Sequence, residues 1–201
     1  MPIQNMLIDL GGVLYDIDIQ STLERYNQMR APGAEPIDYG KSGQHHWFTL
    51  LDNGHADIDE FATGLKNTFS LTGTLEEIKD IWTQLLIGVF PGRVEAVQQL
   101  SQKYRLALLS NTNKHHYDTY YPACKPMFDC MDRIFLSFEM GVRKPDPEIY
   151  LQALAEMGWK AEETLFLDDS LPNIETAKSL GIQTYWIETP HVFEEMMTAM
   201  L

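Results

Sequence analysis

Short apolar runs alternate with segments of helical spacing over most of this chain. Four segments with helical spacing predict helices, at residues 92–103, 113–121, 147–157 and 171–179. Each of them precedes an apolar run that predicts a strand, at residues 105–109, 133–136, 164–167 and 182–187. A similar run at residues 6–9 predicts a strand near the start. Such alternation is typical of a parallel sheet covered by helices on both faces, so we expect a doubly wound, Rossmann-like α/β fold.

The segment between the first strand and residue 90 has a different pattern. Residues 19–30, 57–70 and 76–87 have helical spacing. A stretch that contains proline and glycine, at residues 31–43, is expected to be a loop. No convincing strand is predicted in this segment.

These two patterns together predict the domain organisation. Residues 1–16 and 89–201 are expected to form one α/β core domain. Residues 17–88 are expected to form a helical cap inserted after the first strand. The hinges between them are expected at residues 15–19 and 88–91.

Charge and composition limit the classes of partner. The chain has 29 acidic residues against 15 Lys and Arg residues, a formal net charge of −14. Because this charge repels anions and no local basic patch is visible, neither nucleic acid nor a membrane surface is expected as a partner. No window approaches the ~18 apolar residues of a membrane span, so a cytoplasmic location is expected. The two cysteines, Cys124 and Cys130, are expected to be reduced.

Polar side chains follow several of the predicted strands. Asp9 follows the first strand and comes directly before Leu10, Gly11 and Gly12, and glycines allow backbone to approach a ligand closely. Ser110 and the Asp168–Asp169 pair lie at the ends of two further strands. The carboxyl ends of parallel strands share one edge of the sheet, so these groups are expected to meet there, where open α/β sheets bind their ligands.

Four motifs carry a family resemblance over essentially the whole chain. They are Asp-Leu-Gly-Gly-Val at 9–13, Leu-Ser-Asn-Thr-Asn at 109–113, Arg-Lys-Pro-Asp-Pro-Glu-Ile-Tyr at 143–150 and Asp-Asp-Ser-Leu-Pro-Asn at 168–173. In order and local context they resemble the haloacid dehalogenase-like hydrolase superfamily, and within it the branch that includes bacterial α-glucose-1-phosphate phosphatases. The resemblance implies a Mg²⁺-dependent phosphatase that hydrolyses a small phosphorylated metabolite, a sugar phosphate, as a monomer or homodimer.

The resemblance also implies the role of each acidic residue. Asp9 would be the nucleophile that forms an aspartyl phosphate. Asp9, Asp169 and the backbone carbonyl of Gly11 would bind Mg²⁺ directly, and Asp168 would assist without contacting the ion. Ordinary alternatives are a turn aspartate for Asp9 and an acidic helix start for the pair Asp168–Asp169.

Other motif residues would contact the phosphoryl group. The Ser110 hydroxyl and the backbone amide of Asn111 would donate to its oxygens. Lys144 would neutralise the nucleophile and the phosphoryl group, where the ordinary alternative is a solvated surface lysine. His45 and His46, in the expected cap, are candidates for contacts with the rest of the substrate. Asn173 would face the acidic pair from the following helix.

One position departs from the family pattern. Most phosphatases of this superfamily have a second aspartate two residues after the nucleophile, as general acid, and here that position is Gly11. A leaving group that departs without full protonation would suit such a site, which favours sugar 1-phosphates. Asp16, Asp18 or the pair His45–His46 are the other possible proton sources.

Two alternative functions remain open from the sequence. A 2-haloacid dehalogenase would attack carbon with the same aspartate and no metal, but the adjacent acids Asp168 and Asp169 repel each other unless a cation is present. A non-catalytic module that binds a phosphometabolite fits the absence of the acid at Gly11. It has no need of Asp9 and Lys144 together, so the phosphatase is favoured.

Overall fold

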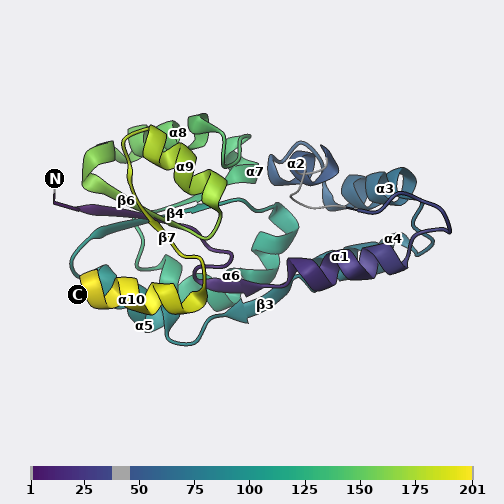
Figure 1. Ribbon diagram of the computed structural model, residues 1–201, viewed down its shortest axis with the longest axis horizontal. Coiled ribbons are helices and arrows are strands. Elements are labelled where there is room, and N and C mark those ends of the chain that lie inside the picture. Colours follow the sequence, from purple (N-terminus) through teal and green to yellow (C-terminus); the bar gives the residue numbers. More distant parts are fainter. Residues whose placement is uncertain (1, 38–45, 201) are drawn as a thin grey trace.

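The computed structural model describes residues 2–37 and 46–200, and its centre is a five-stranded parallel sheet (Figure 1). Across the sheet the order is β5 (Arg133–Leu136), β4 (Arg105–Ser110), β1 (Asn5–Ile8), β6 (Thr164–Asp168) and β7 (Gln183–Trp186). The first strand is therefore central, between β4 and β6. The predicted α/β fold with a parallel sheet is confirmed.

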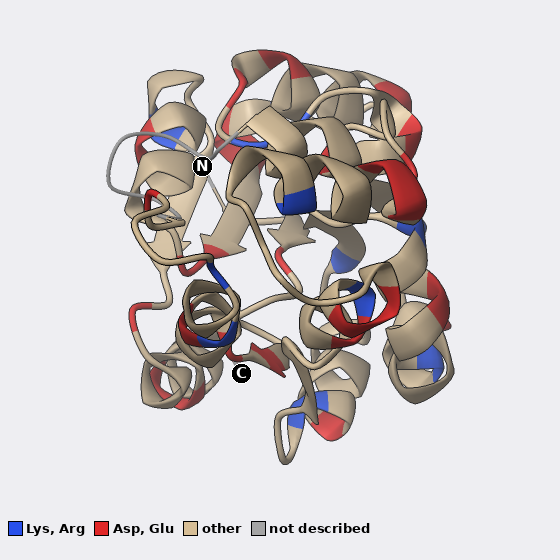
Figure 2. Ribbon diagram, turned by 90° about the vertical axis from the view of Figure 1, so that its right-hand side faces the viewer, with Lys and Arg blue, Asp and Glu red and all other residues tan. Residues whose placement is uncertain are grey.

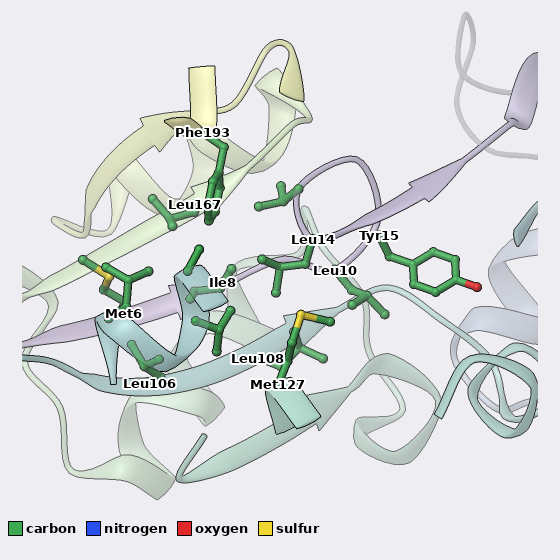
Figure 3. Packing of buried hydrophobic residues seen from close by; sticks show 14 of the residues in the cluster. Met6, Ile8, Leu10, Leu14, Tyr15, Leu106, Leu108, Met127, Leu167 and Phe193 are labelled. Atoms are coloured by element: carbon green, nitrogen blue, oxygen red, sulfur yellow. The ribbon is translucent and has the colours of Figure 1, made fainter. Parts of the chain in front are cut away.

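The central strands β4, β1 and β6 are buried on both faces, and side-chain alternation divides each between two hydrophobic clusters. Met6 and Ile8 of β1 point into one cluster, and Leu7 points into the other. Figure 3 shows the first cluster, in which Met6 and Ile8 pack together with Met127 and Phe193. The continuous apolar runs of the sequence thus reflect a sheet that is covered on both sides.

Helices cover the two faces in separate layers (Figure 1). On the first face lie α5 (Arg93–Leu100), α6 (Lys114–Phe128) and α10 (Pro190–Met200). On the second face lie α8 (Pro147–Met157) and α9 (Leu171–Ser179). The short helices α7 (Ser137–Met140) and η1 (Ala161–Glu163) lie between these elements.

Helix α6 extends seven residues beyond its expected end, at residue 121. It continues through Pro122 and Pro126, although each proline removes a backbone donor. Cys124, Met127 and Phe128 in this second half are buried against the sheet. Their burial outweighs the lost hydrogen bonds, which local propensity alone does not reveal.

Three helices expected after the first strand, and a fourth that was not expected, form a packed group of their own. The expected helices are α1 (Ile19–Gln28), α3 (Ile58–Thr68) and α4 (Leu75–Thr83), and the fourth is α2 (His46–Asp52). Phe48, Phe61 and Trp82 meet at its centre with ring centroids 5.3 Å apart. The group has its own hydrophobic cluster, separate from the two that flank the sheet.

A two-stranded antiparallel ribbon joins this group to the sheet, and it corrects the expectation of helices alone. Strand β2 (Tyr15–Ile17) pairs with β3 (Leu86–Val89). Helix α4 ends at Thr83 rather than at residue 87. The apolar run around Leu86 suits either a helix or a strand, and pairing with β2 decides between them. Both expected hinges overlap this ribbon.

The charge of the chain is spread over its surface. Figure 2 shows acidic positions on several helices and fewer basic ones among them. In the described part of the chain, no helix combines the length and the apolar composition that crossing a bilayer requires.

Candidate active site

The loop after β1 presents Asp9 at the carboxyl edge of the sheet. Its backbone N–H donates to the carbonyl of Leu167 at 2.9 Å, so the neighbouring strand fixes its position. The tight turn that follows needs glycine at position 12, where φ is +74°. A Cβ atom on Gly12 would lie 2.3 Å from Oδ2 of Asp169. The missing side chain therefore allows the first and fourth motifs to come into contact.

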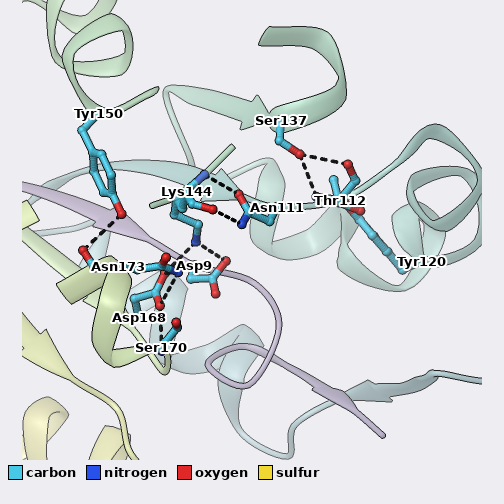
Figure 4. A network of polar contacts seen from close by, with 10 residues as sticks. All are labelled: Asp9, Asn111, Thr112, Tyr120, Ser137, Lys144, Tyr150, Asp168, Ser170 and Asn173. Carbon is cyan, nitrogen blue, oxygen red and sulfur yellow. Dashed lines mark hydrogen bonds and ion pairs between the residues drawn. The ribbon is translucent and has the colours of Figure 1, made fainter. Parts of the chain in front are cut away.

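Lys144 lies in the middle of the acidic residues (Figure 4). Its Nζ is 2.8 Å from Oδ1 of Asp9 and 2.6 Å from Oδ2 of Asp168, and its side chain is only 1% exposed. Burial by itself would lower the pKa of Lys144, but the charges of Asp168 and Asp9 outweigh this effect, so the pKa is raised and the ammonium stays charged. The alternative of a solvated surface lysine is wrong.

Asp168 positions this lysine and is itself held on every side. Its Oδ1 accepts from the Ser170 backbone N–H at 2.8 Å and from Asn173 Nδ2 at 2.9 Å, and the side chain is completely buried. With Lys144 on its Oδ2, this carboxylate is surrounded by donors. Asn173 faces the acidic loop from α9, as its spacing from Asp169 suggests.

Asn111 has a role in the structure that the sequence did not reveal. Its Oδ1 accepts from the backbone N–H of Lys144, and its Nδ2 donates to the backbone carbonyl of the same residue, both at 2.8 Å. The expected contact with substrate involved only the backbone amide of Asn111, while its side chain holds the lysine segment. The sequence shows only that Asn111 follows Ser110 at the end of a strand; it does not show that the Asn111 side chain pairs with the backbone of Lys144.

Asp169 completes a cluster of three carboxylates. Ligand oxygens of Asp9, Asp168 and Asp169 all lie within 4.8 Å of one another. The indole Nε1 of Trp186 donates to the backbone carbonyl of Asp169 at 2.9 Å, so β7 helps to hold the loop. This contact was not predicted.

The crowding of negative charge changes the acidity of the cluster. Burial is the main cause that raises the pKa of Asp9 to about 8, with Lys144 opposing and the two other carboxylates adding to the increase. Burial and the charge of Asp168 also raise the pKa of Asp169 to about 6. One ammonium does not neutralise three carboxylates, so the site favours an additional cation.

Three other expected residues fall in different places. Ser110 ends β4 and is buried at the same sheet edge. His46 begins α2, is exposed, and its ring lies 5.9 Å from that of Trp47. His45 lies outside the described residues, so its expected contact with substrate stays a prediction.

The structure also shows what surrounds Gly11. A Cβ atom there would lie 3.0 Å from Cδ1 of Ile17, which is on β2. Asp18, one of the possible proton sources, instead caps α1, because its carboxylate accepts from the Ser21 N–H at 2.9 Å. Asp16 lies on β2, where it pairs with Gly88 of β3. Ile17 therefore borders Gly11 where the usual aspartate side chain would begin, and the Asp18 carboxylate is engaged at the start of α1.

Comparison with known proteins now identifies the family. A haloacid dehalogenase-like hydrolase model matches residues 3–181. The chain belongs to the haloacid dehalogenase-like hydrolases. Within this family (HAD), it is 30% identical over 207 residues to the D-ribitol-5-phosphate phosphatase of Bacteroides thetaiotaomicron, which covers 99% of this chain and 98% of that protein.

Solved structures of HAD enzymes have the same fold. A HAD family enzyme from Bacteroides thetaiotaomicron, solved in complex with magnesium and inorganic phosphate, matches with a TM-score of 0.75 at 30% identity, over 92% of this chain and 93% of that one. A HAD-like family hydrolase from Porphyromonas gingivalis matches with a TM-score of 0.77 at 31% identity, over 92% and 91% of the two chains. The family predicted from the four motifs is confirmed.

Proposed function

We propose that this HAD hydrolase is a Mg²⁺-dependent phosphatase that acts on a small sugar or polyol phosphate through an aspartyl-phosphate intermediate. The observation that carries the proposal is the ion-paired group in which Lys144 contacts both Asp9 and Asp168. The similarity to a D-ribitol-5-phosphate phosphatase and to an enzyme solved with magnesium and phosphate supports the same conclusion.

The residues present fit a magnesium ion. Three carboxylates within 4.8 Å of one another face a single ammonium, and Mg²⁺ prefers hard oxygen ligands. We assign Asp9, Asp169 and the carbonyl of Gly11 as its ligands, with Asp168 as support. When bound, Mg²⁺ would offset the negative charge of the cluster and polarise a phosphoryl oxygen.

The remaining chemistry belongs to the chain itself. A carboxylate oxygen of Asp9 attacks phosphorus, and the bond from phosphorus to the leaving oxygen breaks with its electron pair going to that oxygen. Water then attacks phosphorus of the aspartyl phosphate, which releases phosphate and regenerates the Asp9 carboxylate. Lys144 and the donors at Ser110 and Asn111 balance the charge of the phosphoryl oxygens.

Asp9 must be ionised to attack. Burial raises the pKa of Asp9 to about 8 even with the Lys144 ammonium beside it, which favours the protonated acid at neutral pH. The fixed ammonium of Lys144, 2.8 Å away, opposes this effect. Lys144 therefore favours the ionised nucleophile in addition to binding phosphate, and a bound Mg²⁺ would lower the pKa of Asp9 further.

The absence of an acid at Gly11 bears on the leaving group. Ile17 lies beside Gly11, so the position of the usual aspartate is occupied by an apolar neighbour. A leaving oxygen must then depart as an alkoxide stabilised in another way, or take a proton from water or from another part of the chain. This favours sugar 1-phosphates, whereas the similarity to a ribitol-5-phosphate phosphatase favours esters of a primary alcohol.

We further propose that residues 17–88 act as a cap that selects the substrate. The helices of this group have a separate core and meet the sheet domain through the β2–β3 ribbon and through contacts to α6 and α7. Closure of such an element over a site excludes water and commits the substrate. The cap proposal predicts that substitutions within it change substrate preference more than chemistry.

The test measures phosphate release by the wild-type protein, Asp9→Asn and the control Asp118→Asn. Asp118 is exposed and pairs with Lys114 on the surface of α6. The substrates are 4-nitrophenyl phosphate, sugar 1- and 6-phosphates and pentitol 5-phosphates, each with and without Mg²⁺. Release that requires Mg²⁺, is lost in Asp9→Asn and is kept in Asp118→Asn supports the proposal.

Two results would overturn the proposal. Phosphate release that persists in Asp9→Asn would exclude the aspartyl-phosphate route. Halide release from a 2-haloacid without Mg²⁺, together with no phosphate release, would favour the dehalogenase instead.

A further inference from the structure

The end of helix α2 meets the segment that carries the active-site lysine. Asp52, the last residue of α2, is buried, and its Oδ2 lies 3.5 Å from Nε of Arg143. Arg143 directly precedes Lys144, so this pair joins the helical group to the residue beside the phosphoryl site. Figure 1 shows α2 next to α7, the short helix of the sheet domain at this junction.

Hydrogen bonds hold both sides of the junction in place. The Ser137 hydroxyl donates to the backbone carbonyl of Asp52 at 2.6 Å and accepts from the backbone N–H of Thr112 at 3.0 Å. On the other side, the Asn111 side chain holds the backbone of Lys144 (Figure 4). Because the backbone is fixed at these points, the position of Arg143 does not depend on its own side-chain contacts.

One donor of the Arg143 guanidinium is left unused. Its Nε is buried and makes no hydrogen bond within the described residues, and the ion pair at 3.5 Å is too long to replace one. Two more buried atoms without a partner in the described chain are Oδ1 of Asn53, which follows Asp52, and Nδ2 of Asn113, which follows Thr112 of the same junction. Buried polar atoms are normally satisfied, so the unpaired Nε of Arg143 beside the Asp52 carboxylate favours a polar ligand at this junction.

The chemistry of the pair selects the kind of ligand. A hydroxyl group both donates and accepts, so it can accept from the Arg143 guanidinium and donate to the Asp52 carboxylate. A second anionic group would be repelled by Asp52, and an ammonium group would be repelled by Arg143. The mixture of donors and acceptors therefore matches a leaving group with several hydroxyls.

We infer that Arg143 and Asp52 bind hydroxyl groups of the leaving group and so select polyol and sugar phosphates over phosphate esters without hydroxyls. This inference rests on the proposed phosphatase function and assigns specificity to two residues of that site. The Arg143 side chain is 20% exposed, so a ligand can reach part of it.

The test compares two substrates in four proteins. Arg143→Gln removes the charge and most donors, Arg143→Lys keeps the charge but removes the planar fork, and Arg133→Gln is the control. Arg133 lies half-exposed on β5, where it pairs with Glu156. We expect Arg143→Gln to lower kcat/KM for a pentitol phosphate about 100-fold more than for 4-nitrophenyl phosphate, because buried partners are left unpaired. Arg143→Lys is expected to fall between wild type and Arg143→Gln.

The outcomes separate the inference from the proposed function. An equal loss on both substrates, with unchanged thermal unfolding, would place Arg143 on the phosphoryl group and overturn the inference. No loss on either substrate would overturn it as well. If the wild type hydrolyses 4-nitrophenyl phosphate but no hydroxylated ester, the phosphatase stands and the inference fails. If it hydrolyses neither, the proposed function itself fails. Should Arg143→Gln not fold, Asp52→Asn supplies the same comparison of the two substrates.

Discussion

His116 joins the sheet domain to the helical group, and burial favours its neutral form there. It lies on α6, is buried, and stacks on the Trp82 ring of α4 with centroids 4.7 Å apart. Its Nε2 donates to the backbone carbonyl of Trp82 at 2.9 Å, which places the proton of the neutral ring on Nε2. Burial lowers the pKa of His116 from 6.5 to about 4.

This lowered pKa makes the stability of the protein depend on pH. Between pH 6.5 and 4 the unfolded chain binds a proton that folded His116 does not, so the contribution is present above pH 6.5 and is lost as the pH falls toward 4. At about 1.4 kcal/mol per pKa unit, the shift corresponds to about 3 kcal/mol in the free energy of unfolding. Roughly 2.5 kcal/mol of it is lost between pH 7.5 and 4.5.

The assay is urea unfolding of wild type, His116→Gln and His191→Gln at several pH values. Glutamine stays neutral and can still donate to the Trp82 carbonyl. The difference in the free energy of unfolding between wild type and His116→Gln therefore reports the titration of His116, because the carboxylates titrate alike in both proteins. This difference should shift by about 2.5 kcal/mol in favour of the variant from pH 7.5 to 4.5. His191 is 80% exposed, so its substitution should produce no such shift. A constant difference for His116→Gln across this range would refute the reasoning.

Three further substitutions test how the site is held. Gly12→Ala should lower kcat about 100-fold or more in the phosphatase assay, because the added Cβ would lie 2.3 Å from Oδ2 of Asp169 and displace that carboxylate. An unchanged kcat would contradict this. Asn111→Ala should lower kcat by a similar factor of about 100 with little change in thermal unfolding, because it removes both hydrogen bonds to the backbone of Lys144. A loss of stability without a loss of kcat would contradict this positioning role. Arg93→Met should lower the free energy of unfolding by about 3 kcal/mol in urea titration, because the buried guanidinium donates to two backbone carbonyls. A change below about 1 kcal/mol would contradict this prediction.

The main elements of the sheet could be predicted because each carries its own signal. The apolar runs around Leu7, Leu108 and Phe166 are buried on both faces, so they read as continuous hydrophobic segments. The second half of α6 and the ribbon formed by β2 and β3 carry no such signal. Prolines obscure the first, and the second depends on pairing between Tyr15 and Val89, which are far apart in the chain.

The candidate site divides in the same way. The four motifs name Asp9, Lys144 and the acidic pair by residue type and position after strands. They contain no information that Asn111 pairs with the backbone of Lys144 or that Trp186 holds the loop of Asp169. These contacts join different strands, so they depend on side-chain geometry across the sheet rather than on neighbours in sequence.

The sequence by itself determined the family, the α/β class and the residues at the carboxyl edge of the sheet, because periodicity and short motifs are local properties of a chain. Only the tertiary structure decided how those residues act together. It placed a buried ammonium between Asp9 and Asp168, set Ile17 beside Gly11, and brought Arg143 to Asp52. The physical reason is that burial and charge pairing arise between segments distant in sequence, and they exist only once the chain has folded.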